Sequence, residues 1–267
     1  MSNQEQEPKI LLVDIETSPI LGYTWTTWDA NVLKVLRPSM VICVAWKWLG
    51  KPGVSVKALP DYSTYRPGQI NDNLLIKELW KILDEADVVV AHNGDQFDVK
   101  KLNAAFVRHN LNAPSMYKTI DTKKVAKKYF RFDSNKLDDL GGYLGEGHKM
   151  STGGFDLWDR CMEGDEVAWT RMKRYNVQDI RLLERVYLRL RPFITNHPNV
   201  VTIAEAKGLK GDVLPVLSSC PTCGSKHLTR RGTAVTQLGI KQRLQCNDCG
   251  AWSSGPLTKS KNRITGN

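Results

Sequence analysis

The sequence has 267 residues, 41% hydrophobic and 25% charged, which is ordinary for a soluble globular protein with one sizeable domain and a small appendage. Its apolar runs are too short to span a membrane, and the polar, acidic residues 1–8 do not resemble a secretory signal, so a cytoplasmic location is expected. The net charge of +10 and the pI near 9.3 favour a polyanionic partner.

The positive charge is concentrated near the C-terminus. Residues 205–267 contain ten Lys/Arg and three Asp/Glu, a net +7, whereas residues 1–204 contain 28 and 25, a net +3. Such a segment can bind nucleic acid, or it can simply be solvated.

Strands and helices alternate along the first 190 residues, which predicts a mixed α/β sheet flanked by helices. The apolar pattern predicts strands at 9–16, 41–48, 53–57, 87–91 and 117–120. Helices are predicted at 71–85, 98–109, 136–144 and 163–191, and Asp121 has the character of a helix cap.

Two carboxylates stand at the end of the first strand. Asp14 and Glu16 are two residues apart, so they lie on one face of the strand. Adjacent acids at the end of a buried strand repel each other unless a cation lies between them. The alternative is an exposed strand end that binds nothing.

A third acid follows the strand at 87–91. Asp98 begins the next helix and lies on its apolar face, one turn before Leu102. It is either a functional carboxylate or a partner of the helix dipole. Asp95, in the preceding turn, is the rival candidate.

The fourth acid interrupts an apolar stripe on the last helix, where a carboxylate is costly without a partner or a metal. Tyr175 lies one turn before Asp179 on the same face, so its hydroxyl can approach whatever Asp179 binds. The stripe consists of Met172, Tyr175, Asp179, Leu183, Val186 and Leu190.

Four acids suit phosphodiester cleavage by two divalent ions, which activate water and stabilise the charge on phosphorus and on the leaving oxygen. An all-oxygen ligand set indicates two Mg²⁺ or Mn²⁺ ions. The predicted metal ligands are Asp14, Glu16, Asp98 and Asp179.

Four of the six cysteines form two Cys-x-x-Cys pairs separated by 22 residues, the spacing of a zinc ribbon with one structural Zn²⁺. Disulfides are the alternative, disfavoured without an export signal. Cys43 and Cys161 are expected to be buried structural thiols. The predicted zinc ligands are Cys220, Cys223, Cys246 and Cys249.

We therefore expect four segments. They are a catalytic domain at 1–194, a linker at 195–217, a zinc ribbon at 218–256 and a flexible basic tail at 257–267.

Three short motifs resemble those of the DEDD 3′→5′ exonucleases, which have a ribonuclease H-like fold. Asp14-Ile15-Glu16-Thr17 is similar to the first motif, and the segment from Asn93 to Asp98 to the second. Tyr175 to Asp179 is similar to the third in its tyrosine version, because the position of the histidine in the other subclass is Arg174. The resemblance covers roughly residues 8–192.

This resemblance implies that the four acids bind the metals and that Tyr175 orients the attacking water. It also implies that Thr17 and Asn93 contact the substrate near its terminal nucleotide. The implied activity is a metal-dependent hydrolase that releases nucleoside monophosphates from single-stranded 3′ ends, with DNA slightly favoured over RNA. Two alternatives remain open: an inactive nucleic-acid-binding or recruitment module, and a structure-specific endonuclease of the same fold.

The cysteine segment resembles zinc ribbons of transposases and other nucleic-acid proteins, which bind nucleic acid or a protein partner. Its candidate phosphate contacts are Arg230, Arg231, Lys241 and Arg243. Four tryptophans lie near the predicted active-site strands: Trp25, Trp28, Trp46 and Trp48. Trp25 and Trp28, just after the first motif, could stack on unpaired bases, although core or interface packing is the expected role of these tryptophans.

Overall fold

The computed structural model describes residues 8–28, 30–203, 219–236 and 239–258. The chain divides into two compact units, one comprising Lys9–Tyr187 and the other containing the residues from Leu188 onward. Among the described residues, no helix combines the length and the apolar character that a membrane span requires.

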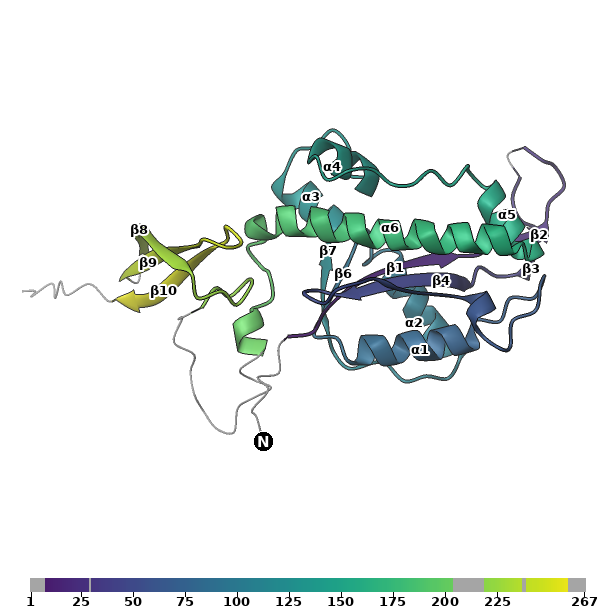
Figure 1. Ribbon diagram of the computed structural model, residues 1–267, viewed down its shortest axis with the longest axis horizontal. Helices are drawn as coiled ribbons and strands as arrows, with labels where there is room; N and C mark the ends of the chain where they lie inside the picture. The colour runs from purple at the N-terminus through teal and green to yellow at the C-terminus, as the bar shows by residue number, and fades with distance from the viewer. Residues whose placement is uncertain (1–7, 29, 204–218, 237–238, 259–267) are drawn as a thin grey trace, which may run out of the picture. The chain divides into compact units, whose positions relative to one another are not determined.

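A five-stranded mixed sheet forms the centre of the first unit (Figure 1). Its strand order is β5-β4-β1-β6-β7, and β1 pairs antiparallel with β4 and parallel with β6. This arrangement confirms the predicted mixed α/β sheet. The strands are β1 (Ile10–Thr17), β4 (Val41–Trp48), β5 (Ser55–Ala58), β6 (Val88–Ala91) and β7 (Lys118–Asp121).

Helices cover both faces of this sheet: α1 and α2 lie on one face, and α6 runs along the other (Figure 1). Short 3₁₀ turns at Leu59–Asp61 and Arg191–Phe193 follow β5 and α6. The helices are α1 (Asn73–Asp84), α2 (Asp98–Arg108), α3 (Thr122–Tyr129), α4 (Leu137–Tyr143), α5 (Asp156–Glu163) and α6 (Glu166–Leu190).

The long C-terminal helix begins later than the sequence pattern suggests. Gly164 adopts a left-handed φ of 94° and ends α5, so α6 begins at Glu166 and not at residue 163 as predicted. The predicted apolar stripe on α6 is buried along its whole length, including Asp179. The packing of this stripe holds α6 on the sheet.

A small hairpin, β2 (Leu21–Tyr23) with β3 (Lys34–Arg37), is inserted between β1 and β4. The sequence pattern did not predict it. Ser18 closes its base, because its backbone N–H donates to the Met40 carbonyl at 2.8 Å and its Oγ accepts from the Met40 N–H at 3.0 Å. β1 and β4 still pair directly with each other in the main sheet, so the hairpin is an insertion in the sequence between them and does not belong to that sheet.

The second unit contains a three-stranded antiparallel sheet in the order β10-β9-β8. Its strands are β8 (Leu228–Thr236), β9 (Gly239–Cys246) and β10 (Trp252–Thr258). The strand β10 includes the first two residues of the tail predicted at 257–267. The rest of that tail, and most of the predicted linker at 195–217, lie outside the described residues.

Candidate active site and cysteine cluster

The strand β1 presents Asp14 and Glu16 on one face, while Ile15 between them is buried on the other. An oxygen of Asp14, one of Glu16 and one of Asp179 all lie within 4.8 Å of one another. The structure therefore brings together three of the four predicted acids, from the central strand and from the middle of α6.

Asp179 is paired with a residue that sequence reasoning missed. The Lys149 ammonium lies 2.6 Å from Asp179 Oδ2 and 4.9 Å from the centre of the Tyr175 ring. Burial alone would lower the pKa of Lys149, but the attraction of Asp179 outweighs it and holds that pKa above its usual value. Lys149 thus places a positive charge where the sequence analysis predicts a divalent cation.

Burial and mutual repulsion make the carboxylates poor acids. Burial, followed by repulsion from Asp98, Glu16 and Asp179, holds the pKa of Asp14 well above its usual value. Burial and the charge of Asp179 raise the pKa of Glu16 to about 8. Burial raises the pKa of Asp98 to about 7 although the Ile15 N–H donates to its carboxylate. Burial also raises the pKa of Asp179, against the opposing charge of Lys149.

Such a cluster fits divalent cations. Mg²⁺ lies about 2.0–2.1 Å from its oxygen ligands, so two oxygens on opposite sides of one ion are about 4.2 Å apart. The spacing of the Asp14, Glu16 and Asp179 oxygens is compatible with this geometry after small side-chain adjustments. A bound cation would remove the repulsion that raises the pKa values of these acids.

Asp98 lies at the start of α2 and is buried, with Oδ1 accepting the Ile15 N–H at 3.1 Å. It is not one of the three acids whose oxygens converge, although its charge contributes to the raised pKa of Asp14. Its rival, Asp95, points elsewhere and pairs with Lys124 at 2.7 Å. The geometry therefore favours Asp98 over Asp95 as the fourth acid.

The loop before Asp98 is held by Asp121. This carboxylate caps α3 by accepting the N–H groups of Lys123 and Lys124, as its predicted role requires. It also accepts the N–H groups of Asn93 and Asp95, at 2.9 and 3.3 Å. Asn93, a predicted substrate contact, has a left-handed φ of 64°, and Thr17, the other, ends β1 partly buried.

Asn176 is a second residue that the sequence analysis missed. It is fully buried, and its side-chain amide donates to both Asp14 Oδ2 and the Asp14 carbonyl oxygen. Its own oxygen accepts the thiol of Cys43 at 3.6 Å. The available signal was spacing: Asn176 lies one turn from Met172 and one turn from Ile180, both buried, so it also faces the core.

We expect Asn176→Ala to weaken metal binding, because the hydrogen bonds that orient the Asp14 carboxylate are lost. Loss of an outer-shell partner costs roughly 10–100-fold in metal affinity or activity. The measurement is the Mn²⁺ concentration that gives half of the maximal thermal stabilisation. Gln178→Ala, two residues away, removes the acceptor of a hydrogen bond from exposed Arg181; it is the control and should leave that concentration unchanged. Equal Mn²⁺ dependence in both variants would refute the role of Asn176.

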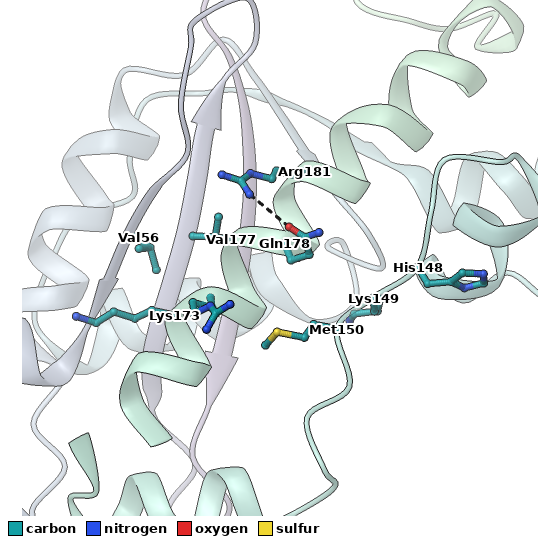
Figure 2. Close-up of a pocket in the computed structure, with 9 residues that line it drawn as sticks. Val56, His148, Lys149, Met150, Lys173, Val177, Gln178 and Arg181 are labelled. Atoms are coloured by element: carbon teal, nitrogen blue, oxygen red, sulfur yellow. Dashed lines mark hydrogen bonds between the residues drawn. The ribbon is translucent and has the colours of Figure 1, made fainter. Parts of the chain in front are cut away.

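A hollow of about 560 Å³ over α6 is lined by basic residues (Figure 2). Lys149 lies at one side of the hollow and Lys173 at the other, and Arg174 and Arg181 also line it. Lys149 also contacts Asp179, so the basic hollow lies next to the acidic cluster. A phosphate backbone is the kind of ligand that such a surface attracts.

The four cysteines of the second unit converge. All four sulfurs lie within 4.8 Å of one another, and both the Cys220–Cys249 and the Cys223–Cys246 sulfur pairs are 3.7 Å apart. Four sulfurs at about 2.3 Å from one zinc at the corners of a tetrahedron are about 3.8 Å apart. The cluster therefore has the dimensions of a Cys₄ zinc site.

The turns around the cysteines have features that suit metal binding. Gly224 and Gly250 both have positive φ values, 79° and 75°, which allow the chain to turn after each pair. Burial would raise the pKa of Cys246, but hydrogen bonds from the backbone N–H groups of Cys249 and Asp248 lower it to about 7. His227, a possible substitute ligand, is exposed and hydrogen-bonds Asp248 instead.

The predicted phosphate contacts of the ribbon lie on β8 and β9. Arg230, Arg231 and Arg243 are exposed and Lys241 is partly buried. Arg243 stacks on the half-exposed ring of Trp252 at 4.8 Å, so this face combines positive charge with an aromatic ring.

Comparison with known proteins assigns most of the first unit to a superfamily. The model of the RNase_H superfamily (RNase_H_2) matches residues 55–191, just over half of the chain. The chain belongs to the RNase_H superfamily. The matched segment contains Asp98, Tyr175 and Asp179, whereas Asp14 and Glu16 precede it. No curated protein matches the sequence.

Among solved structures, the chain is similar to the family B DNA polymerase from the hyperthermophilic archaeon Pyrobaculum calidifontis. The TM-score is 0.51 at 16% identity, over 70% of this chain and 25% of the polymerase. At this identity the likeness shows the fold alone, and this chain corresponds to only a quarter of the polymerase. The RNase H-like fold and the acidic cluster together support a nuclease function.

Proposed function

We propose that the chain is a two-metal-ion 3′→5′ exonuclease that removes nucleoside monophosphates from single-stranded 3′ ends. The observation that carries this proposal is the convergence of Asp14, Glu16 and Asp179 within 4.8 Å, with Tyr175 one turn from Asp179. Asp98 is proposed as the fourth metal ligand. When bound, two Mg²⁺ or Mn²⁺ ions would supply the activated water and neutralise the charge on the phosphate.

The side chains of this chain have separate roles in the proposal. The carboxylates would hold the cations, and Tyr175 would orient the attacking water through its hydroxyl. Lys149 would be released from Asp179 by the incoming cations and would then be free to contact the substrate phosphate. Thr17, at the end of β1, and Asn93, in the loop after β6, are the proposed contacts to the terminal nucleotide.

The second unit is proposed to bind one structural zinc through its four cysteines. The ribbon, at 218–256, would use Arg230, Arg231, Lys241 and Arg243 to hold the nucleic-acid backbone or a partner. Residues 195–217 would serve as the linker from a catalytic domain at 1–194.

The direction of degradation tests the function. Purified protein with Mg²⁺ or Mn²⁺ is incubated with single strands of DNA and of RNA, labelled at either the 3′ or the 5′ end. The expected result is immediate release of labelled mononucleotide from the 3′-labelled strand and a ladder of shortening 5′-labelled products. A chelator should stop both reactions.

Circular single strands separate the alternatives. An exonuclease leaves a circle intact, so cleavage of circles would favour a structure-specific endonuclease. Strands that stay intact in every case, but are bound equally with and without chelator, would favour an inactive binding module.

A further inference from the structure

The hairpin between β1 and β4 exposes an unusual amount of apolar surface. Trp25 is 88% exposed and Trp28 is 84% exposed, so neither packs in the core, and packing at an interface stays a prediction. By contrast, Trp46 and Trp48 on β4 pack against the core, as expected. The other exposed apolar side chains of the hairpin are Ile20, Leu21, Tyr23, Val32, Leu33, Val35 and Leu36.

This exposure is built into the hairpin. Val35 and Leu36 are neighbours in β3, so they point to opposite faces, and both are about half exposed. The strands approach closely at Gly22, where a Cβ would lie only 2.5 Å from a Val32 methyl and 2.6 Å from the Lys34 carbonyl oxygen. Many exposed apolar side chains gathered on one hairpin of a folded chain indicate an interaction site.

The position of the hairpin indicates which ligand it meets. β1 carries Asp14 and Glu16 and leads through Thr17 and Ser18 directly into the hairpin. In Figure 1, β2 and β3 lie beyond the C-terminal end of β1, apart from the five-stranded sheet. A nucleic-acid strand whose 3′ end lies at the acids would therefore lie close to the hairpin.

The chemistry of the hairpin suits unpaired bases. Its most exposed side chains are indole rings, on which bases of any sequence can stack. The hairpin segment contains two cations, Lys34 and Arg37, and one carboxylate, Asp29, which lies outside the described residues, so its net charge is +1. A positive charge suits a polyanion. A protein partner is the competing occupant, and the aliphatic residues of the stem would suit it. The link to the acidic strand and the positive charge favour nucleic acid.

We propose that Trp25 and Trp28 form a stacking surface for unpaired bases of the strand whose 3′ end enters the acidic cluster. This inference rests on the proposed function for the identity of the substrate. The two tryptophans would contact bases outside the metal site. They would accept bases of any sequence, because each base has an aromatic face.

Binding to strands with and without bases tests this inference. The full chain is used in an Asp179→Asn background, without added Mg²⁺ or Mn²⁺, so that strands are not degraded. The probes are a 20-nucleotide oligothymidylate and an abasic deoxyribose-phosphate strand of the same length and charge. We expect Trp25→Ala with Trp28→Ala to raise Kd for oligothymidylate on the order of 10-fold or more, because each lost stacking contact costs about this factor. Kd for the abasic strand should not change.

Two control variants separate stacking from simple loss of apolar surface. Trp25→Phe with Trp28→Phe keeps aromatic rings and should retain most of the affinity. Leu33→Thr with Leu36→Thr removes exposed aliphatic surface and should bind both probes as the parent does. Equal Kd values for oligothymidylate in the alanine variant and the parent, or an equal loss on the abasic strand, would overturn the inference.

Sedimentation of the same proteins tests the competing occupant. A parent dimer that becomes monomeric in the alanine variant, with oligothymidylate binding unchanged, would assign the hairpin to self-association and overturn the inference. Failure of the proposed function looks different. If the chain with Asp179 intact and Mn²⁺ added binds oligothymidylate more tightly than the abasic strand but never shortens it, exonuclease activity is refuted and the stacking surface remains.

Discussion

The Asp14→Asn protein is expected to lose hydrolytic activity by about 1000-fold or more and yet to be more stable than the parent when no divalent ion is present. The activity is lost because a metal ligand is removed, and about 4 kcal/mol of transition-state stabilisation corresponds to this factor. The stability rises because burial, followed by repulsion from Asp98, Glu16 and Asp179, holds the pKa of Asp14 well above its usual value. Each unit by which folding raises a pKa costs about 1.4 kcal/mol once the group ionises.

Two measurements check this prediction. Urea unfolding at pH 7 without divalent ions should give a higher free energy of unfolding for Asp14→Asn than for the parent. Added Mn²⁺ should stabilise the parent strongly and the variant weakly. Asp95→Asn is the matched control, because Asp95 lies near the same loop but pairs with Lys124 at the surface. It should retain activity and change stability by no more than about 1 kcal/mol. An Asp14→Asn protein that is less stable than the parent would mean that this carboxylate has a structural role.

Burial of the acids, together with repulsion from neighbouring carboxylates, sets the pH dependence of the metal-free protein. A carboxyl group whose pKa is raised by folding binds its proton more tightly in the folded state, so stability falls as pH rises. The fall should begin near the unfolded pKa of about 4 and continue to the folded values of about 8 for Glu16 and about 7 for Asp98. Mn²⁺ should remove most of this dependence, because it binds the ionised carboxylates.

Removal of zinc is expected to unfold the ribbon and leave the first unit folded. Among the described residues, the buried cluster of the ribbon consists of Cys220, Cys246 and Ala251, with Cys223, Leu228 and Cys249 packed against it. Four of these six side chains are the proposed zinc ligands, so little hydrocarbon remains to hold three strands together. Structural zinc supplies an apparent binding free energy of about 10–16 kcal/mol at pH 7, and this is the free energy that folds such modules.

The measurement combines metal content with hydrogen exchange. The parent should contain one zinc per chain, and Cys246→Ser should contain much less and lose protection of the amides in β8 and β9. The amides of the first unit, such as those in β1, should keep their protection. His227→Ala is the control and should keep its zinc, because His227 contacts Asp248 and not the sulfurs. Protected ribbon amides in zinc-free protein would show that the ribbon folds without metal.

Much of this protein is determined by local sequence. The strand and helix bounds follow from apolar periodicity, so β4 matches its predicted range and β1, α1 and α2 differ by only one or two residues at either end. The cysteine spacing identified the four sulfurs that converge, because two Cys-x-x-Cys turns in a short segment have few other ways to pack. Asp179 was found because a carboxylate in a buried stripe is costly wherever the helix packs.

The tertiary structure decided the features that depend on residues distant in sequence. Lys149 contacts Asp179, and Asn176 orients Asp14, which lies 162 residues earlier in the sequence. No local sequence pattern predicts either contact. The choice of Asp98 over Asp95 came from burial and from the Lys124 ion pair. The hairpin after the first motif was missed, and its tryptophans were assigned to packing, because an apolar pattern alone predicts burial. Whether a core exists to bury such residues is a property of the folded chain, and at Trp25 and Trp28 no core covers them.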